Sequence, residues 1–285
     1  TLEGLGATLN NLANCESDSD PLRATAASEE ALSVKEKAIV HGGETAERLT
    51  RLMTGHGTHS HRLEAIGQQE KAGRHTRLAA EMADRLILLH PHDAEVVDTA
   101  IHWLNVASRD AESSFDFKDA FSIARRSAEA STHLLERSGV TALRIKLAHD
   151  ACEHALSAAQ RLGDAATIGW AESRLDAVDE MLFSVDTPTT GLVILTASVI
   201  LRRTSFERPI PQGVVDACRD RLVEALARET GVESRLKLLD AADSIARCAS
   251  TDQNADFETR LWSHLDATES FLRERSAEEH GSGPE

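Results

Sequence analysis

Tyrosine is absent from this sequence of 285 residues, and aromatic residues together make up only 4% of it. Sheet proteins draw on aromatic and β-branched residues, and clusters of both are scarce here. Alanine and leucine, which favour helices, recur along the whole chain. The composition therefore argues against a sheet protein and predicts an all-α protein.

Cysteine is also scarce, with four residues that lie far apart and never form a CxxC motif. Cys152, Cys218 and Cys248 fall at apolar positions of helical patterns, whereas Cys15 does not. Such cysteines are typical of small core residues in a reducing compartment. We therefore expect no disulfide framework and a cytoplasmic location.

Long apolar runs are missing as well. The longest covers residues 191–201, whereas a membrane-spanning helix needs about 20 residues. No signal peptide is visible, so we expect no membrane partner. The sequence begins with Thr1 and becomes helix-like almost at once, which suggests a processed or excised part of a longer protein.

Positive charge is in the minority, with 31 Lys and Arg residues against 47 Asp and Glu residues, a formal net charge of −16. A surface of that sign repels phosphate backbones. The charge therefore argues against nucleic acid as a partner and suits basic or mixed-charge proteins.

What the sequence does contain is helical periodicity, in stripes of apolar residues three or four positions apart. The clearest are Leu78, Met82, Leu86, Leu89; Ala148, Cys152, Ala155, Ala159, Leu162; Ile168, Ala171, Leu175, Val178, Leu182; and Phe257, Leu261, Leu265, Thr268, Leu272. Breaks, most of them marked by glycine or proline, separate these stripes at residues 20–21, 41–43, 55–57, 73, 91, 139, 163–164, 187–188, 209–213, 231 and 251–255. This punctuation predicts 12–13 helices.

Short connections make successive helices antiparallel. Their number and monotony favour an α-solenoid of antiparallel helix pairs over a compact bundle, the alternative architecture. Three tryptophans, Trp103, Trp170 and Trp262, lie on apolar stripes, and we expect them in the core.

One stretch, residues 60–91, resembles a tetratricopeptide (TPR) repeat. With Pro91 as the closing proline, Leu63, Ile66 and Gly67 take the large, large and small positions of the first helix. Gly73 takes the turn and Ala79 the small position of the second helix. Residues 8–38, with their Leu-Asn-Asn-Leu-Ala and Glu-Glu-Ala-Leu segments, are similar to degenerate bacterial repeats, although their turn is one residue short.

The resemblance divides the chain. Residues 1–92 are identified as TPR-like repeats, residues 93–276 as longer, irregular helix pairs that recur about every 44–48 residues, and residues 277–285 as a flexible tail. The resemblance implies a concave surface, lined by the first helix of each pair, that holds a peptide or a helix. Such arrays often serve as scaffolds or sensors within larger bacterial signalling proteins.

The most suggestive chemical motif is Gly55-His56-Gly57-Thr58-His59, which resembles the histidine segment of subtilisin-like proteases. Its serine and aspartate partners have no matching context here, so we interpret the motif as part of a histidine-rich loop between helices, residues 56–61. Its weak metal candidates are His56, His59 and His61, but zinc usually takes three or four convergent ligands. We therefore expect no metal, no other cofactor and no enzyme.

For a protein or peptide partner, the candidate contacts are amides and local positive charges. Amide side chains can pair with a ligand's backbone. The candidates are Asn10, Asn11, Asn14, Gln68, Asn105, Arg125 and Arg126.

Three hypotheses for function follow. The first is a non-enzymatic interaction module that binds a protein or peptide in a helical groove. The second is a metal-binding protein or helical enzyme that uses residues 56–61. The third is a self-assembly module, because alanine-rich faces and uncapped terminal repeats favour a homo-oligomer.

Overall fold

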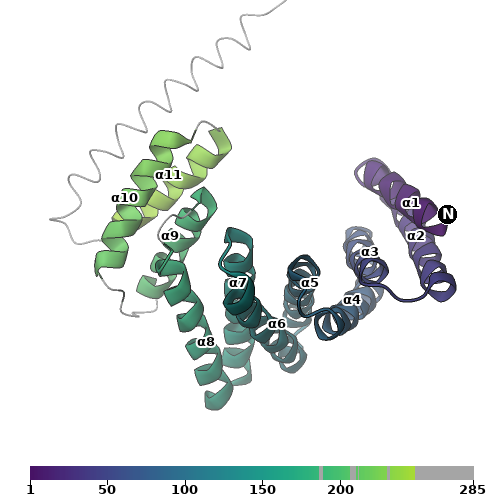
Figure 1. Ribbon diagram of the computed structural model, residues 1–285, viewed down its shortest axis with the longest axis horizontal. Coiled ribbons are helices and arrows are strands. Elements are labelled where there is room, and N and C mark those ends of the chain that lie inside the picture. The colour runs from purple at the N-terminus through teal and green to yellow at the C-terminus, as the bar shows by residue number, and fades with distance from the viewer. Residues whose placement is uncertain (186–188, 206–209, 211, 230–231, 248–285) are drawn as a thin grey trace, which may run out of the picture. The chain divides into compact units, whose positions relative to one another are not determined.

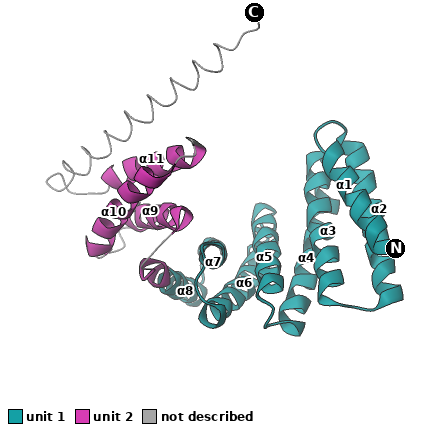
Figure 2. Ribbon diagram, turned by 45° about the horizontal axis from the view of Figure 1, so that its top comes forward, with its two compact units in different colours: residues 1–178 teal, residues 179–285 magenta. Residues whose placement is uncertain are grey.

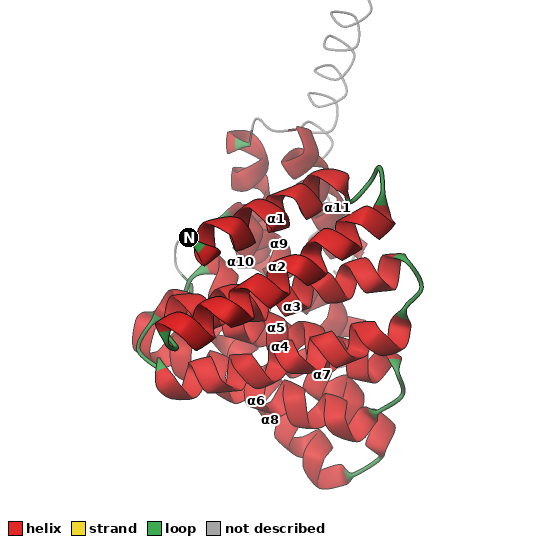
Figure 3. Cartoon of the chain, turned by 90° about the vertical axis from the view of Figure 1, so that its right-hand side faces the viewer, coloured by secondary structure: helices red, strands yellow, loops and turns green. Residues whose placement is uncertain are grey.

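The computed structural model describes residues 1–185, 189–205, 210, 212–229 and 232–247. Within these ranges the chain forms eleven α-helices and no strand (Figures 1 and 3). The helices are α1 Leu2–Glu16, α2 Pro21–Gly42, α3 Ala46–Ala65, α4 Gln69–Leu89, α5 Ala94–Ser113, α6 Phe117–Ser138, α7 Ala142–Leu162, α8 Ala165–Phe183, α9 Thr190–Ser205, α10 Gln212–Arg228 and α11 Val232–Arg247. The predicted stripe from Phe257 to Leu272, Cys248, Trp262 and the tail all lie outside the described residues.

The chain divides into two compact units, residues 1–178 and 179–285 (Figure 2). In the first unit each helix from α1 to α7 packs against the next one along the chain, and α3 also contacts α5, as α5 contacts α7. In the second unit α9, α10 and α11 pack against one another. Sequential packing of short-linked helices is the α-solenoid-like, all-α arrangement that the sequence predicts.

The helix pairs recur with a constant spacing. The first helices α3, α5, α7 and α9 begin at residues 46, 94, 142 and 190, each 48 residues after the one before. The second helices α2, α4, α6 and α8 begin at residues 21, 69, 117 and 165, with the same interval. The predicted boundary at residue 92 falls between α4 and α5, and the pairs on either side of it share this spacing; the division there stays a prediction.

Caps repeat with the helices. Thr45, Asp93 and Thr141, 48 residues apart, each accept a hydrogen bond from a backbone N–H of the first turn that follows. Such a cap stabilises a helix by about 1 kcal/mol. Within the pairs, Asp20 caps α2, where Pro21 occupies the first turn as expected at that break.

Two predicted breaks are wrong. Residues 55–57 lie inside α3, and Gly73 lies inside α4. The turn between these helices is instead at Gly67, whose φ of 76° is the left-handed conformation that ends helices. Gly67 therefore lies in the turn and is not the small residue of a first helix. The helix pair α3–α4 begins at Ala46, well before residue 60, where the TPR resemblance begins.

The core is built mainly from alanine. In α4 the buried residues are Ala72, Thr76, Ala79, Ala80, Ala83 and Leu86, whereas Leu78 and Leu89 of the predicted stripe are exposed. The stripe of α7 is confirmed at four of its five positions, all but Leu162.

The predicted core tryptophans lie in the first unit. Trp103 is buried as predicted, and Trp170 packs at the edge of the α6–α7–α8 core. Small side chains let the helices pack close together, and the larger side chains between them fill the remaining space.

Candidate binding pocket

A cavity of about 310 Å³ opens between α1, α2 and α3 in the first unit. It is lined by Glu3, Ala7, Asn10, Asn11, Lys35, Ala38, Arg48, Thr50, Arg51 and Thr54. Pockets of this size hold small ligands or single side chains of a partner. Two of the seven predicted partner contacts, Asn10 and Asn11, thus lie at one pocket.

Several polar groups of this pocket have unused hydrogen-bonding capacity. Within the described part of the chain, the amides of Asn10 and Asn11 make no hydrogen bond to another residue. The hydroxyl oxygen of Thr50 is buried and has no partner there either. The two amides at this pocket can each still donate and accept hydrogen bonds, which suits them to a polar ligand.

Lys35 extends from α2 across to α3. Its Nζ lies beside Gly55, so close that a methyl group at residue 55 would stand 2.9 Å from that nitrogen. Burial lowers the pKa of Lys35, and the positive charges of Arg62 and Arg51 lower it further. The described residues provide no ion pair for this ammonium group.

Arg62 of α3 is only 8% exposed. Its positive charge is one of those that lower the pKa of Lys35. One of its nitrogens, Nη2, donates a hydrogen bond to Oδ1 of Asn14, a third predicted contact residue. Its Nε and Nη1 are buried without a partner among the described residues. The Arg62 guanidinium group is thus bonded to the Asn14 amide, and no described carboxylate forms an ion pair with it.

The two arginines that line the pocket are tied to acidic residues. Arg48 Nε donates to Glu3 Oε1 at 2.8 Å, and the same side chain donates to the backbone oxygens of Gly42 and Gly43 at the end of α2. Arg51 pairs with Glu47 at 2.5 Å. Glu3, the one carboxylate among the lining residues, is therefore already engaged.

The remaining predicted contacts lie elsewhere. Gln68 precedes α4 at the turn after α3. Asn105 is 7% exposed. Its amide donates a hydrogen bond to Leu147 O at 3.0 Å and accepts one from Ser127 Oγ at 2.6 Å, so this amide is engaged within the protein. On α6, Arg125 pairs with Glu129 and lies over the Trp170 ring, and Arg126 pairs with Asp84.

The histidine-rich segment is not a loop, because residues 56–61 form part of α3. His56 and His59 are 3% and 2% exposed, whereas His61 is exposed on another face. The three predicted metal candidates therefore do not converge. His61 instead lines a second cavity of about 410 Å³ with Glu64, Gln69, Val106, Arg109, Asp110 and Ser113.

His56 and His59 form a buried cluster with His75 of α4. Nδ1 of His56 lies 2.9 Å from Nδ1 of His75, and the rings of His59 and His75 meet edge to face at 4.6 Å. Burial lowers the pKa of His56 and of His59 to about 4, and neighbouring positive charges add to this effect. Burial also lowers the pKa of His75. Burial therefore disfavours the protonated form of all three rings.

The hydroxyl group of Ser28 joins His59 to the backbone of α2. Ser28 Oγ lies 2.6 Å from His59 Nδ1 and 2.8 Å from Thr25 O. The cluster thus ties α2, α3 and α4 together through specific polar contacts.

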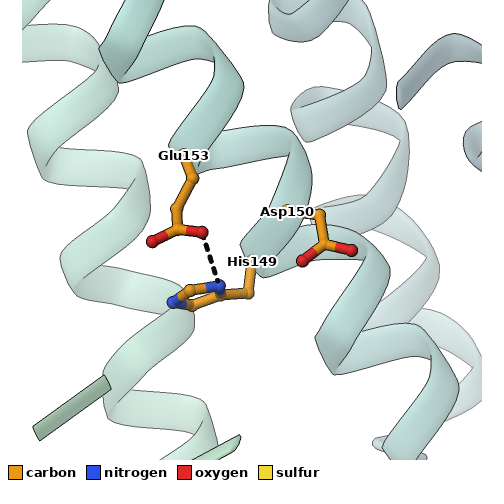
Figure 4. A group of neighbouring side chains, drawn as sticks. All are labelled: His149, Asp150 and Glu153. Atoms are coloured by element: carbon orange, nitrogen blue, oxygen red, sulfur yellow. Dashed lines mark ion pairs between the residues drawn. The ribbon is translucent and has the colours of Figure 1, made fainter. Parts of the chain in front are cut away.

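A second polar group lies on α7, where His149, Asp150 and Glu153 place ligand-type atoms within 4.8 Å of one another (Figure 4). His149 is 4% exposed, and its Nδ1 lies 3.6 Å from Glu153 Oε2. Asp150 also accepts from Lys146 Nζ at 2.6 Å. All four side chains come from two turns of one helix, where residues three or four positions apart are neighbours.

The sequence did not single out Lys35, Thr50 or Arg62. Their importance depends on α1, α2 and α3 meeting, which brings together residues that are 15 or more positions apart. One signal was available: two charged residues, Lys35 and Arg62, fall among apolar and small residues on the buried faces of their helices.

In the described part of the chain, none of the helices combines the length and the apolar character needed to cross a membrane. No protein-family model and no curated protein matches this sequence.

Proposed function

We propose that this chain is a non-enzymatic interaction module that binds a protein or peptide partner at the pocket between α1, α2 and α3. The observation that carries the proposal is the pair of unused amides there, those of Asn10 and Asn11. Amides at a pocket can pair with the main chain of an extended peptide, which gives affinity with little demand on its sequence.

The arrangement of the titratable groups favours binding over catalysis. General acid–base chemistry needs groups that converge on a site a substrate can reach. His56 and His59 are almost fully buried, and their contacts are with side chains of adjacent helices. These histidines therefore stabilise the helix packing in this proposal.

The repeated helix pairs support the same function. Solenoids present extended surfaces on which partners dock, and the sequence resemblance to TPR-like arrays implies such a role. A scaffold or sensor role in a larger cytoplasmic signalling protein is the setting we propose for this module.

The test is a peptide selection followed by affinity measurements. Peptides selected from a displayed library on the wild-type chain are titrated by fluorescence anisotropy against wild type, Asn10→Ala/Asn11→Ala and Gln160→Ala. Gln160 is an exposed amide on α7 and serves as the matched control. We expect the double variant to bind about 5- to 150-fold more weakly, since two lost hydrogen bonds are worth about 1–3 kcal/mol.

The control variant should bind as wild type does. Failure to select any peptide above background, or selected peptides that bind the double variant with wild-type affinity, would contradict the proposal.

A further inference from the structure

The indole ring of Trp103 closes the junction between α5 and the preceding pair, α3–α4. The ring belongs to one buried cluster with Ala80, Ala83 and Leu86 of α4. It also lies on Gly57 of α3. One aromatic side chain thus fills the space between these three helices.

The preceding junction, where α3 packs against α2, has a different set of side chains. Because α2 and α4 begin 48 residues apart, as do α3 and α5, residues 48 positions apart are counterparts. The counterparts are Gly55 for Trp103, Leu32 for Ala80, Lys35 for Ala83 and Ala38 for Leu86. A glycine therefore stands where the next junction has its aromatic residue.

The direction of residue 55 supports this correspondence. A methyl group on Gly55 would stand 2.9 Å from Leu32 Cδ2 and 2.9 Å from Lys35 Nζ. Residue 55 thus points at the counterparts of the two alanines that share a cluster with Trp103. Lys35 and Leu32 fill part of this space, and the cavity of about 310 Å³ lies along Lys35 and Ala38.

The first helices are also packed differently at the two junctions. Whereas α3 contacts α5, α1 makes no comparable contact with α3. The cavity separates them, with Ala7, Asn10 and Asn11 of α1 on its wall. The junction of α1, α2 and α3 is thus not closed by a large side chain of this chain.

The walls of the cavity suit the face and the polar edge of an aromatic side chain. Lys35 is half-buried, and no described residue forms an ion pair with it. A cation is attracted to the face of an aromatic ring, more strongly where water is excluded. The amide oxygens of Asn10 and Asn11 can accept from an indole N–H or a phenol O–H, which need a partner when buried. A carboxylate would use Lys35 but would gain nothing from the apolar wall at Ala7 and Ala38.

We propose that the cavity between α1, α2 and α3 binds an aromatic side chain of the protein or peptide partner, with Lys35 beside the ring and Asn10 and Asn11 at its polar edge. The inference rests on the proposed function, because it uses the same pocket, and it names the side chain that anchors the partner. The chain has no tyrosine and few aromatic residues of its own. The partner supplies here what Trp103 supplies at the next junction.

The first measurement is the sequence of the peptides selected on the whole wild-type chain. We expect a Trp, Tyr or Phe residue at a fixed position in most of them. Replacing that residue by Ala should weaken binding about 30-fold or more, as for aromatic anchors at other interfaces, and Leu should restore part of the affinity. Fluorescence anisotropy with the synthetic peptides measures both changes.

Filling the cavity from within the chain tests where the anchor binds. Ala7 lines the cavity and is exposed, so Ala7→Leu adds a side chain there without displacing the core. The control is Ala26→Leu, at an exposed position of α2 that does not line the cavity. With both variants folded by circular dichroism, we expect Ala7→Leu to bind the aromatic peptides at least tenfold more weakly and Ala26→Leu to bind them as wild type does.

Lys35→Met keeps the length of the side chain and removes its charge. It should weaken binding of a Trp peptide about 2- to 30-fold and leave the affinity for the matching Leu peptide unchanged. The control is Lys37→Met, at an exposed position of the same helix. A residue that only packs the pocket would change the affinity for both peptides equally.

Four results would overturn the proposal: selected peptides without an aromatic residue, an acidic residue in its place as the common anchor, wild-type binding by Ala7→Leu, or equal effects of Lys35→Met on the Trp and Leu peptides. If such peptides still bind Asn10→Ala/Asn11→Ala weakly, the proposed function stands without this anchor. If no peptide is selected, the proposed function fails, and ligand-observed NMR with N-acetyltryptophanamide then tests the cavity alone. Binding to wild type that Ala7→Leu removes would support the aromatic site, and no binding would overturn it.

Discussion

The indole ring of Trp103 lies directly on Gly57, where a methyl group would stand 2.0 Å from Trp103 Cζ3. The contact joins α5 to α3, the first helices of two successive pairs, and Trp103 is 5% exposed. A glycine in the middle of a helix costs about 0.5–1 kcal/mol relative to alanine. At residue 57 that cost is offset by the close packing of the ring.

Replacing Gly57 by Ala should therefore lower the free energy of unfolding. Either the ring or the helix must move, and overpacking of this kind costs typically about 1–3 kcal/mol. Urea unfolding followed by circular dichroism measures the change.

The matched control is Gly73→Ala in α4, where the added methyl group would meet Asp110 at an ordinary 3.6 Å. Since residue 73 is helical, this change should raise the free energy of unfolding by up to about 1 kcal/mol. If both variants lose the same stability, the packing of Trp103 on Gly57 is not what requires a glycine.

These two glycines also show where the sequence sufficed and where it did not. The composition and the periodicity predicted an all-helical array correctly, because helix propensity and apolar spacing are local properties. Whether a glycine ends a helix or admits a neighbouring side chain depends on another helix. Gly55 admits Lys35 and Gly57 admits Trp103, so a local rule misplaced the break, and with it the histidines of residues 56–61.

The pocket was predictable only in part, for the same reason. Asn10 and Asn11 stand out as amides on a first helix, and the structure places both at the cavity. Asn105 has the same character in sequence but faces α6 and α7, where it is buried. Amide content identifies candidates, whereas helix rotation decides which of them reach a surface.

Acidification should destabilise the first unit between about pH 6.5 and pH 4. The pKa of His56 and of His59 is about 4 when folded, against an ordinary 6.5. The unfolded chain therefore binds more protons in this window, so the free energy of unfolding falls as the pH falls through it. Urea unfolding at a series of pH values measures the loss.

A variant isolates the contribution of the cluster. His59→Gln removes one titrating group while keeping a donor for Ser28, so its stability should depend less on pH than that of wild type. His133→Gln, at an exposed position on α6, is the control. Parallel pH curves for wild type and His59→Gln would show that the buried cluster does not govern acid stability.

Phe115 should be replaceable by glycine with a gain in stability. Its φ of 61° is left-handed, and the residues 48 positions before and after it, Gly67 and Gly163, are glycines with φ of 76° and 71°. The side chain is 81% exposed, so it contributes little packing. A left-handed non-glycine residue costs about 1–2 kcal/mol, which exceeds the entropy of about 0.4–1 kcal/mol that glycine adds to the unfolded chain.

Phe115→Gly should thus raise the free energy of unfolding by about 0.5 kcal/mol, whereas Gly163→Ala should lower it by about 1 kcal/mol. Thermal unfolding of the two variants and wild type measures both changes. A loss of stability in Phe115→Gly would mean that the edge-to-face contact of Phe115 with Phe117 matters more than the backbone strain.

Replacing Asn105 should lower the free energy of unfolding without changing the affinity for a partner. Its amide bridges three helices, from Ser127 on α6 to the backbone oxygen of Leu147 on α7. Asn105→Ala removes two buried hydrogen bonds, each worth about 0.5–1.5 kcal/mol. A double-mutant cycle with Ser127→Ala should show coupling of more than about 0.5 kcal/mol, because the two side chains share one hydrogen bond.

The same variant should bind selected peptides with wild-type affinity at a temperature where it is folded, because the pocket lies on α1, α2 and α3. Asn10→Ala/Asn11→Ala should do the reverse, with weak binding and near wild-type stability, since neither amide bonds to a described residue. If Asn105→Ala abolishes binding while circular dichroism shows a folded chain, the partner surface includes α5. The pocket between α1, α2 and α3 would then be only one part of it.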